Sequence, residues 1–325
     1  MTEFELIRTF FASQPIHRAD VIVGIGDDAA VLRPPPGQEL VVTTDILIEG
    51  VHFLPGADPA ALGHKALAVN LSDLAAMGAE PAWFLLNLTL PRVDADWLRG
   101  FCAGLYTLAR RYDMQLVGGN TARGSLAIAV EAHGFVSAGR ALTRGGARPG
   151  DGVYVTGSLG DAGLALAHRL KRRELSAREA AAIADRLDRP EPRVEEGMAL
   201  RGIATSTVDI SDGLIADLGH ILEASGVGAR VTLEEIPLSA TYRARLREIG
   251  WDTALAGGED YELCFTAPTQ NKAALERALP GRFTRIGEIT AQRGLNLLLP
   301  SGEPYTPALT GHDHFAEKSQ ESLTE

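Results

Sequence analysis

Five short segments gather acidic, amide or hydroxyl side chains, most of them beside glycine at predicted strand ends. They are residues 24–29 (GIGDDA), 43–45 (TTD), 70–73 (NLSD), 118–120 (GGN) and 209–213 (DISDG). Glycine lets the backbone approach a ligand closely. The ligand atoms on offer are oxygens, and the sequence has no Cys/His pair at zinc spacing, so the pattern favours Mg²⁺ or Mn²⁺ over zinc.

Each segment has a plainer explanation when it is taken alone. Residues 27–28 would cap a turn, and residues 118–120 would form one. Residues 43–45 combine two β-branched strand formers with an aspartate that would cap the strand end. Residues 209–213 would cap the helix that is predicted to follow them.

Asp73 is harder to explain as an ordinary residue. It lies midway along a predicted helix that is largely apolar, where a carboxylate is costly unless it faces water, a partner or a metal. Asn70 lies three residues earlier, so the two side chains are expected to share one face of the helix.

Two common nucleotide-binding motifs are excluded. Residues 24–29 match the dinucleotide pattern G-x-G-x-x-A, but Asp27 and Asp28 would face the pyrophosphate, and residues 31–36 run into prolines instead of a crossover helix. The sequence also lacks a G-x-x-x-x-G-K-[ST] phosphate loop.

The composition is that of a soluble globular protein of more than one domain, with 325 residues, 45% hydrophobic and 22% charged. The net charge of −11 argues against nucleic acid, so an anionic ligand would need cations between itself and the protein. The apolar runs are too short for a membrane span, and the acidic start does not resemble a signal peptide. Cys102 and Cys264 have apolar neighbours, which favours reduced thiols in the cytoplasm.

The predicted elements alternate between strand and helix in both halves, which indicates a mixed α/β fold with two α/β domains. The glycine- and arginine-rich residues 144–152 suggest the boundary, giving domains 1–143 and 144–325. Strands are predicted at 21–23, 40–44, 82–90, 115–117, 126–135, 153–156, 261–266 and 285–289, and a further strand ends at residue 210. Helices are predicted at 3–12, 58–77 and 94–112. Further helices are predicted after residue 163, on both sides of residues 189–192, and after residue 213.

Taken together, the segments resemble the ordered signature of the thiamine-monophosphate kinase family, from about residue 24 to residue 315. The segments that carry the resemblance are 26–29 (GDDA), 43–45 (TTD), 49–53 (EGVHF), 69–74 (VNLSDL), 118–120 (GGN), 209–214 (DISDGL), 257–263 (GGEDYEL) and His314-Phe315. The wider superfamily of aminoimidazole ribonucleotide synthetase-like proteins shares the acidic segments. The segments 49–53 and 257–261 and the terminal pair are more particular to the kinase.

The resemblance implies a set of site residues and a dimer formed through the N-terminal sheets. The implied magnesium ligands are Asp28, Thr43, Thr44, Asp45, Asp73, Asn120, Asp209 and Asp212. The implied ATP contacts are Gly119, Asn120, Arg144 and Ser211, and the implied thiamine monophosphate contacts are His52, Glu259 and Phe315. Three positions depart from the family pattern: Asn120 replaces a frequent aspartate, Cys102 a nucleotide-contacting tyrosine, and His312 an aromatic residue.

The implied reaction is direct in-line transfer of the γ-phosphate of ATP to the phosphate of thiamine monophosphate. The acceptor phosphate has a second pKa of about 6, so no general base is expected. The alternative is another ATP-using enzyme of the superfamily, a synthetase or a maturation factor. A synthetase would need a glycine-rich or Cys/Lys segment before Val21, which is absent. A protein that only binds nucleotide would have little need for the full set of carboxylates.

Overall fold

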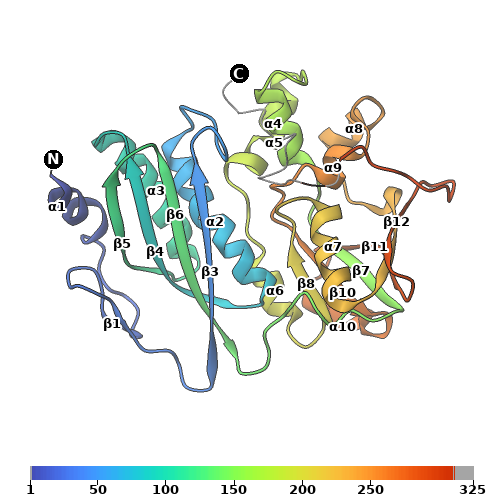
Figure 1. The fold of residues 1–325 in the computed structure, drawn as a ribbon, viewed down its shortest axis with the longest axis horizontal. Coiled ribbons are helices and arrows are strands. Elements are labelled where there is room, and N and C mark those ends of the chain that lie inside the picture. Colours follow the sequence, from blue (N-terminus) through green and yellow to red (C-terminus); the bar gives the residue numbers. More distant parts are fainter. Residues whose placement is uncertain (1, 310, 312–325) are drawn as a thin grey trace. The chain divides into compact units, whose positions relative to one another are not determined.

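The computed structural model describes residues 2–309 and 311, and these form two compact units (Figure 1). The N-terminal unit comprises residues 2–74 and 79–139, and the C-terminal unit comprises residues 75–78 and 140–311. Each unit has its own β-sheet. The domain boundary expected between residues 143 and 144 stays a prediction.

The N-terminal unit is built on a four-stranded sheet with the strand order β3-β6-β4-β5. Its strands are β3 (Gln38–Ile48), β4 (Glu80–Leu90), β5 (Gln115–Arg123) and β6 (Ala127–Ser137). Only the β4–β5 pair is parallel. Helices α2 (Pro59–Ala76) and α3 (Ala95–Arg111) lie on one face of the sheet (Figure 1). The two helices pack so closely that a Cβ atom added at Gly104 of α3 would lie 1.8 Å from the carbonyl oxygen of Ala60 of α2.

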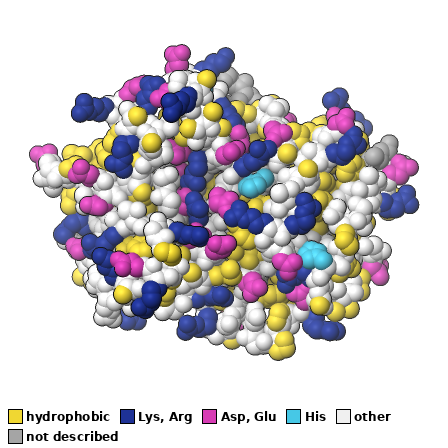
Figure 2. Space-filling model, turned by 180° about the vertical axis from the view of Figure 1, so that it is seen from behind, with side chains coloured by type: hydrophobic (Ala, Val, Ile, Leu, Met, Phe, Trp, Pro, Cys, Tyr) yellow, Lys and Arg dark blue, Asp and Glu magenta, His cyan; other side chains and the backbone are white. Residues whose placement is uncertain are grey.

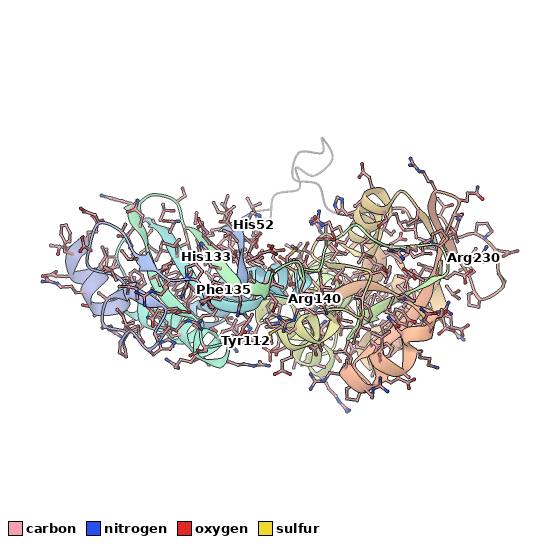
Figure 3. All side chains as sticks on the ribbon, turned by 90° about the horizontal axis from the view of Figure 1, so that it is seen from below. His52, Tyr112, His133, Phe135, Arg140 and Arg230 are labelled. Atoms are coloured by element: carbon pink, nitrogen blue, oxygen red, sulfur yellow. The ribbon has the colours of Figure 1, made fainter. Side chains whose placement is uncertain are left out.

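The other face of this sheet is partly covered by the strands β1 (Val21–Val23) and β2 (Val31–Leu32). The rings of Trp83 and Phe135 pack edge to face, with their centroids 4.9 Å apart. The indole N–H of Trp83 donates to Oδ1 of Asp20 at 3.0 Å. His133 and Phe135 lie two residues apart on β6 (Figure 3). This small apolar cluster attaches the β1–β2 loop, which carries Asp28, to the sheet.

The chain begins with α1 (Glu3–Leu6), which continues as a π-helical turn over Ile7–Phe11. Phe10 and Phe11 are buried, whereas Phe4 is 75% exposed.

The C-terminal unit is built on a six-stranded sheet in the order β12-β9-β11-β7-β10-β8, antiparallel except for the pair β12–β9. Its strands are β7 (Asp151–Thr156), β8 (Ser206–Asp209), β9 (Gly228–Thr232), β10 (Leu263–Pro268), β11 (Phe283–Thr290) and β12 (Gly294–Leu298). Its helices are α4 (Asp161–Arg169), α5 (Ala177–Asp188), α6 (Val194–Leu200), α7 (Leu214–Ser225), α8 (Ala240–Ile249), α9 (Asp252–Ala256) and α10 (Lys272–Ala278), with 3-10 turns at Leu233–Glu235 and Thr269–Asn271. Residues of α4, α5 and α7 share one apolar core with alternate residues of the strands.

The predicted class is confirmed: both units are α/β mixtures with mixed sheets. Two strand ends were predicted wrongly. The strand expected at 40–44 continues to Ile48, and the strand expected at 115–117 continues to Arg123. Asp45 and residues 118–120 therefore lie inside strands and not at their ends. No helix within the described residues is long and apolar enough to cross a membrane.

Candidate functional site

In the N-terminal unit, three predicted metal ligands lie on the helix-covered face of the sheet. Thr43 and Asp45 are two residues apart on β3, so their side chains point to the same face. The hydroxyl of Thr43 donates a short hydrogen bond to Oδ2 of Asp73, which α2 brings to that face. The structure therefore brings together Thr43 and Asp73, with Asp45 one pleat further along the strand.

Thr44 does not join this group through its side chain. It is exposed on the opposite face of β3, and its hydroxyl donates to the carbonyl oxygen of Val130 at 3.1 Å. Adjacent residues in a strand point to opposite faces, so the hydroxyls of Thr43 and Thr44 lie on opposite faces of β3.

Asn70 lies one turn before Asp73 and is completely buried. Its amide nitrogen donates to the carbonyl oxygen of Ala66 at 3.1 Å, but its Oδ1 accepts no hydrogen bond from any residue in the described part of the chain. A buried oxygen without a donor is costly. An unused amide oxygen of this kind, one helical turn from the carboxylate of Asp73, is a ligand type that hard cations prefer.

Asp28 lies in the loop between β1 and β2, where it is exposed. Its N–H donates to Oδ1 of Asp27 at 2.8 Å. Gly26 has a φ of 129°, a conformation that favours glycine, so the loop turns at this point. The loop keeps the carboxylate of Asp28 at the surface of the unit.

His52 lies in the turn that follows β3 (Figure 3). Its Nδ1 accepts a hydrogen bond from the N–H of Ile48 at 3.0 Å. Because Nδ1 is the acceptor, the neutral ring carries its proton on Nε2. His52 can therefore act as a hydrogen-bond donor through Nε2.

Gly119 and Asn120 lie inside β5 and are exposed. The φ of Gly119 is 140°, and a Cβ atom there would lie 1.9 Å from the carbonyl oxygen of Leu86 on β4. Only glycine fits this close approach. Cys102 is buried in α3, and burial raises the pKa of its thiol to about 12.

In the C-terminal unit, residues 209–213 are joined to the loop of residues 257–262 by main-chain hydrogen bonds. The N–H of Ile210 donates to the carbonyl oxygen of Glu262 at 2.7 Å, the N–H of Tyr261 to that of Ile210 at 2.8 Å, and the N–H of Glu259 to that of Ser211 at 2.7 Å. The two predicted site segments of this unit therefore behave as one structural piece.

The loop that carries Glu259 has an unusual backbone. Glu259 has a φ of 60° and Tyr261 a φ of 50°, a region that non-glycine residues seldom adopt. Gly258 also has a positive φ, and a Cβ atom there would lie 2.7 Å from the carbonyl oxygen of Ser211. Strain of this kind is concentrated at functional sites.

A buried ion cluster under this loop was missed by the sequence analysis. The guanidinium of Arg193 donates to both carboxylate oxygens of Glu262 at 2.6 Å. Arg186 donates to Oε1 and the hydroxyl of Thr156 donates to Oε2, each at 2.7 Å. Burial would raise the pKa of Glu262, but Arg193 and Arg186 hold it below its usual value. The two arginines flank the proline-rich residues 189–192, which was the only local signal.

Two further buried carboxylates were also missed. Asp260 accepts from the N–H of Gly160 at 2.9 and 3.0 Å, and burial raises its pKa to about 8. Asp217 accepts from the N–H groups of Ser211, Asp212 and Gly213. Burial and the charge of Asp212 raise the pKa of Asp217 to about 7.

The remaining predicted residues are placed as follows. Asp209 ends β8 and is buried, and Asp212 and Ser211 are half-buried in the turn before α7. Arg144 is exposed, and its carbonyl oxygen accepts from the Ser225 hydroxyl at 3.4 Å. Phe315, together with His312 and His314, lies outside the described residues.

The surface charges are mixed. On the face drawn in Figure 2, acidic and basic side chains are interspersed. The net charge of −11 is therefore not gathered into a single acidic region on that face.

Comparisons with known proteins agree with this arrangement. Residues 26–136 match the N-terminal domain of the AIR synthase related proteins, and residues 148–299 match their C-terminal domain. The chain is 51% identical to the thiamine-monophosphate kinase of Escherichia coli O157:H7 over 319 residues, which is 97% of this chain and 98% of that protein.

Solved structures are similar as well. The thiamine-monophosphate kinase of Stenotrophomonas maltophilia K279a is 42% identical, with a TM-score of 0.84 over 94% of this chain and 98% of that one. AaThiL complexed with AMPPCP and TMP is 33% identical, with a TM-score of 0.76 over 96% of this chain and 97% of that one. The resemblance found in the sequence motifs is confirmed, and this chain belongs to the thiamine-monophosphate kinase family.

Proposed function

We propose that this protein transfers the γ-phosphate of ATP to the phosphate of thiamine monophosphate and so forms thiamine diphosphate. The observation that carries the proposal is the near full-length identity to thiamine-monophosphate kinases. The related AaThiL structure holds AMPPCP, an ATP analogue, together with TMP. Chromatography of the reaction products tests the proposal: thiamine diphosphate and ADP are expected in equal amounts, and ADP without thiamine diphosphate would contradict it.

The chemistry of the donor set supports magnesium as the metal. Thr43, Asp45, Asp73 and the unused Oδ1 of Asn70 are hard oxygen ligands on one face of one unit. We assign the remaining ligand roles to Asp28, Asn120, Asp209 and Asp212. Bound Mg²⁺ would offset the repulsion between the phosphates of donor and acceptor.

The substrate contacts follow from the same assignment. Gly119, Asn120, Ser211 and Arg144 would contact ATP, and Gly119 does so through its backbone, because it has no side chain. His52 would donate through Nε2–H to the acceptor phosphate, and Glu259 would face the thiazolium cation together with Phe315. No side chain is assigned as a general base, because the acceptor phosphate is ionised near neutral pH.

The two threonines of β3 give a matched pair of variants that tests the metal assignment. Thr43→Val removes the hydroxyl that contacts Asp73 and is expected to raise the Mg²⁺ concentration for half-maximal activity about tenfold. Thr44→Val is expected to stay within about twofold of wild type, because its hydroxyl lies on the other face of the strand. Magnesium titrations of initial rate measure both, and equal effects of the two variants would contradict the assignment of Thr43.

We also propose that the protein is a cytoplasmic homodimer formed through its N-terminal sheet. The supporting observation is the apolar row on the edge strand β3: Leu40, Val42 and Ile46 are 46%, 53% and 50% exposed. A row of this kind beside unpaired main-chain groups is an aggregation hazard unless a partner covers it. Sedimentation velocity is expected to give twice the 34.6 kDa mass of one chain, and a single-chain mass at micromolar concentration would contradict the dimer.

A further inference from the structure

A carboxylate in the first turns of helix α7 binds the turn that precedes the helix. Oδ2 of Asp217 accepts hydrogen bonds from three successive N–H groups: Ser211 at 3.1 Å, Asp212 at 3.0 Å and Gly213 at 3.0 Å. Asp217 is only 2% exposed. These three N–H groups belong to the segment that carries the proposed magnesium ligands of the C-terminal unit.

An ordinary helix cap is not available at this position. The residue before α7 is Gly213, which has no side chain to accept a hydrogen bond. Its φ is 112°, and a Cβ atom there would lie 2.7 Å from Cα of Ala256, so serine or aspartate does not fit. Asp217 instead binds the N–H groups of residues 211–213, which precede the first helical residue, Leu214.

The segment is therefore held from two sides. Asp217 binds its N–H groups, while the carbonyl oxygen of Ser211 accepts from the N–H of Glu259 at 2.7 Å. A side chain can only be placed as well as the main chain that carries it. With the main chain of residues 211–213 held on both sides, the position from which the Asp212 side chain starts is fixed. Asp209 lies two residues before this segment, at the end of β8.

The same contact has a consequence for anions. Free N–H groups at the start of a helix attract phosphate directly. Here a buried carboxylate of the protein already occupies the N–H groups of Ser211, Asp212 and Gly213, just before the helix. A phosphate near this segment therefore cannot use these three N–H groups.

We propose that Asp217 is a positioning residue of the phosphotransfer reaction: its carboxylate, as a hydrogen-bond acceptor, sets the main chain of residues 211–213 so that Asp209 and Asp212 can bind magnesium. The proposal rests on the proposed function, because it assumes that these two aspartates are metal ligands. Asp217 touches neither substrate nor metal in this account.

Two substitutions and one control test it. Asp217→Ala removes the acceptor, Asp217→Asn keeps an acceptor oxygen without the charge, and Ser176→Ala removes the cap of α5 elsewhere in the unit, where the Ser176 hydroxyl accepts from the N–H of Glu179 at 3.3 Å. Both alanine variants lose a side chain that accepts hydrogen bonds from main-chain N–H groups near the start of a helix, so both are expected to lower the temperature of unfolding. Only Asp217→Ala is expected to alter metal binding.

The measurements are the Mg²⁺ dependence of turnover, the KM for thiamine monophosphate, and Mn²⁺ binding by electron paramagnetic resonance with the metal alone. For Asp217→Ala we expect a rise of about tenfold or more in half-saturating Mg²⁺, weaker Mn²⁺ binding and a KM for thiamine monophosphate within about twofold of wild type. Asp217→Asn and Ser176→Ala are expected to remain within about threefold of wild type in all three.

Two results would overturn the proposal: Asp217→Ala matching Ser176→Ala in its metal dependence, or Asp217→Asn being as defective as Asp217→Ala. A failure of the proposed function gives a different result. In that case wild-type turnover itself would not respond to Mg²⁺, whatever the variants do.

Discussion

Asp73→Asn is expected to lower turnover at least about a hundredfold, because it removes a negative charge from the proposed metal group. Asparagine keeps an oxygen that can accept the hydrogen bond of the Thr43 hydroxyl, so local packing is preserved. The temperature of unfolding is therefore expected to change little. Initial rates over a range of Mg²⁺ concentrations, combined with thermal unfolding, measure both effects.

The matched control is Asp96→Asn. Asp96 also carries a carboxylate in the N-terminal unit, but its side chain is 91% exposed in the first turn of α3. This variant is expected to turn over like wild type. High Mg²⁺ is expected to restore Asp73→Asn only in part. Wild-type turnover of Asp73→Asn at low Mg²⁺ would show that the carboxylate of Asp73 does not bind the metal.

Glu259→Gln is expected to weaken binding of thiamine monophosphate by about ten- to a hundredfold, the loss that follows when a partly buried carboxylate no longer faces a cation. ATP binding is expected to remain nearly unchanged. The loop is tied to residues 210 and 211 through the N–H groups of Tyr261 and Glu259, and these main-chain bonds survive the substitution. Calorimetric titration of each ligand measures the two affinities.

Glu234→Gln is the matched control, because it removes one carboxylate charge from an exposed position in the same unit. It is expected to leave both affinities as they are in wild type. If Glu259→Gln weakens ATP and thiamine monophosphate equally, Glu259 belongs with the metal ligands. If it weakens neither, the positive φ of Glu259 serves the fold and not the substrate.

Several features of the site were readable in the sequence because their cause is local. Asp58-Pro59 predicts a helix start, and the helix runs over Pro59–Ala76 as expected. A carboxylate midway along this apolar helix predicts a partner, and Thr43 supplies one.

Other features depend on residues far apart in the sequence. The length of β3 is set by its pairing with β6, from Gln38 to Ile48, so a local pattern could not show that Asp45 lies inside the strand. The buried position of Glu262 depends on Arg186 and Arg193, which lie about seventy residues earlier. The proline-rich residues 189–192 between the two arginines are the only local sign of that contact.

The two adjacent threonines of β3 show how much a strand pattern predicts. Thr43 and Thr44 were both predicted as metal ligands, and adjacent side chains in a strand point to opposite faces. The structure separates their hydroxyls, with Thr43 at Asp73 and Thr44 at the carbonyl oxygen of Val130. The two-residue period of the strand predicts this separation of the hydroxyls, and the metal role of Thr44 stays a prediction.

Phosphate transfer to thiamine monophosphate is tested by the release of ADP from ATP with and without each component. ADP release is expected only when thiamine monophosphate and Mg²⁺ are both present, and it is expected to stop when the metal is removed with a chelator. Pyridoxal phosphate or a nucleoside monophosphate in place of thiamine monophosphate is expected to give no ADP. ADP release without thiamine monophosphate, or at an equal rate with another monophosphate, would show that thiamine monophosphate is not the specific acceptor.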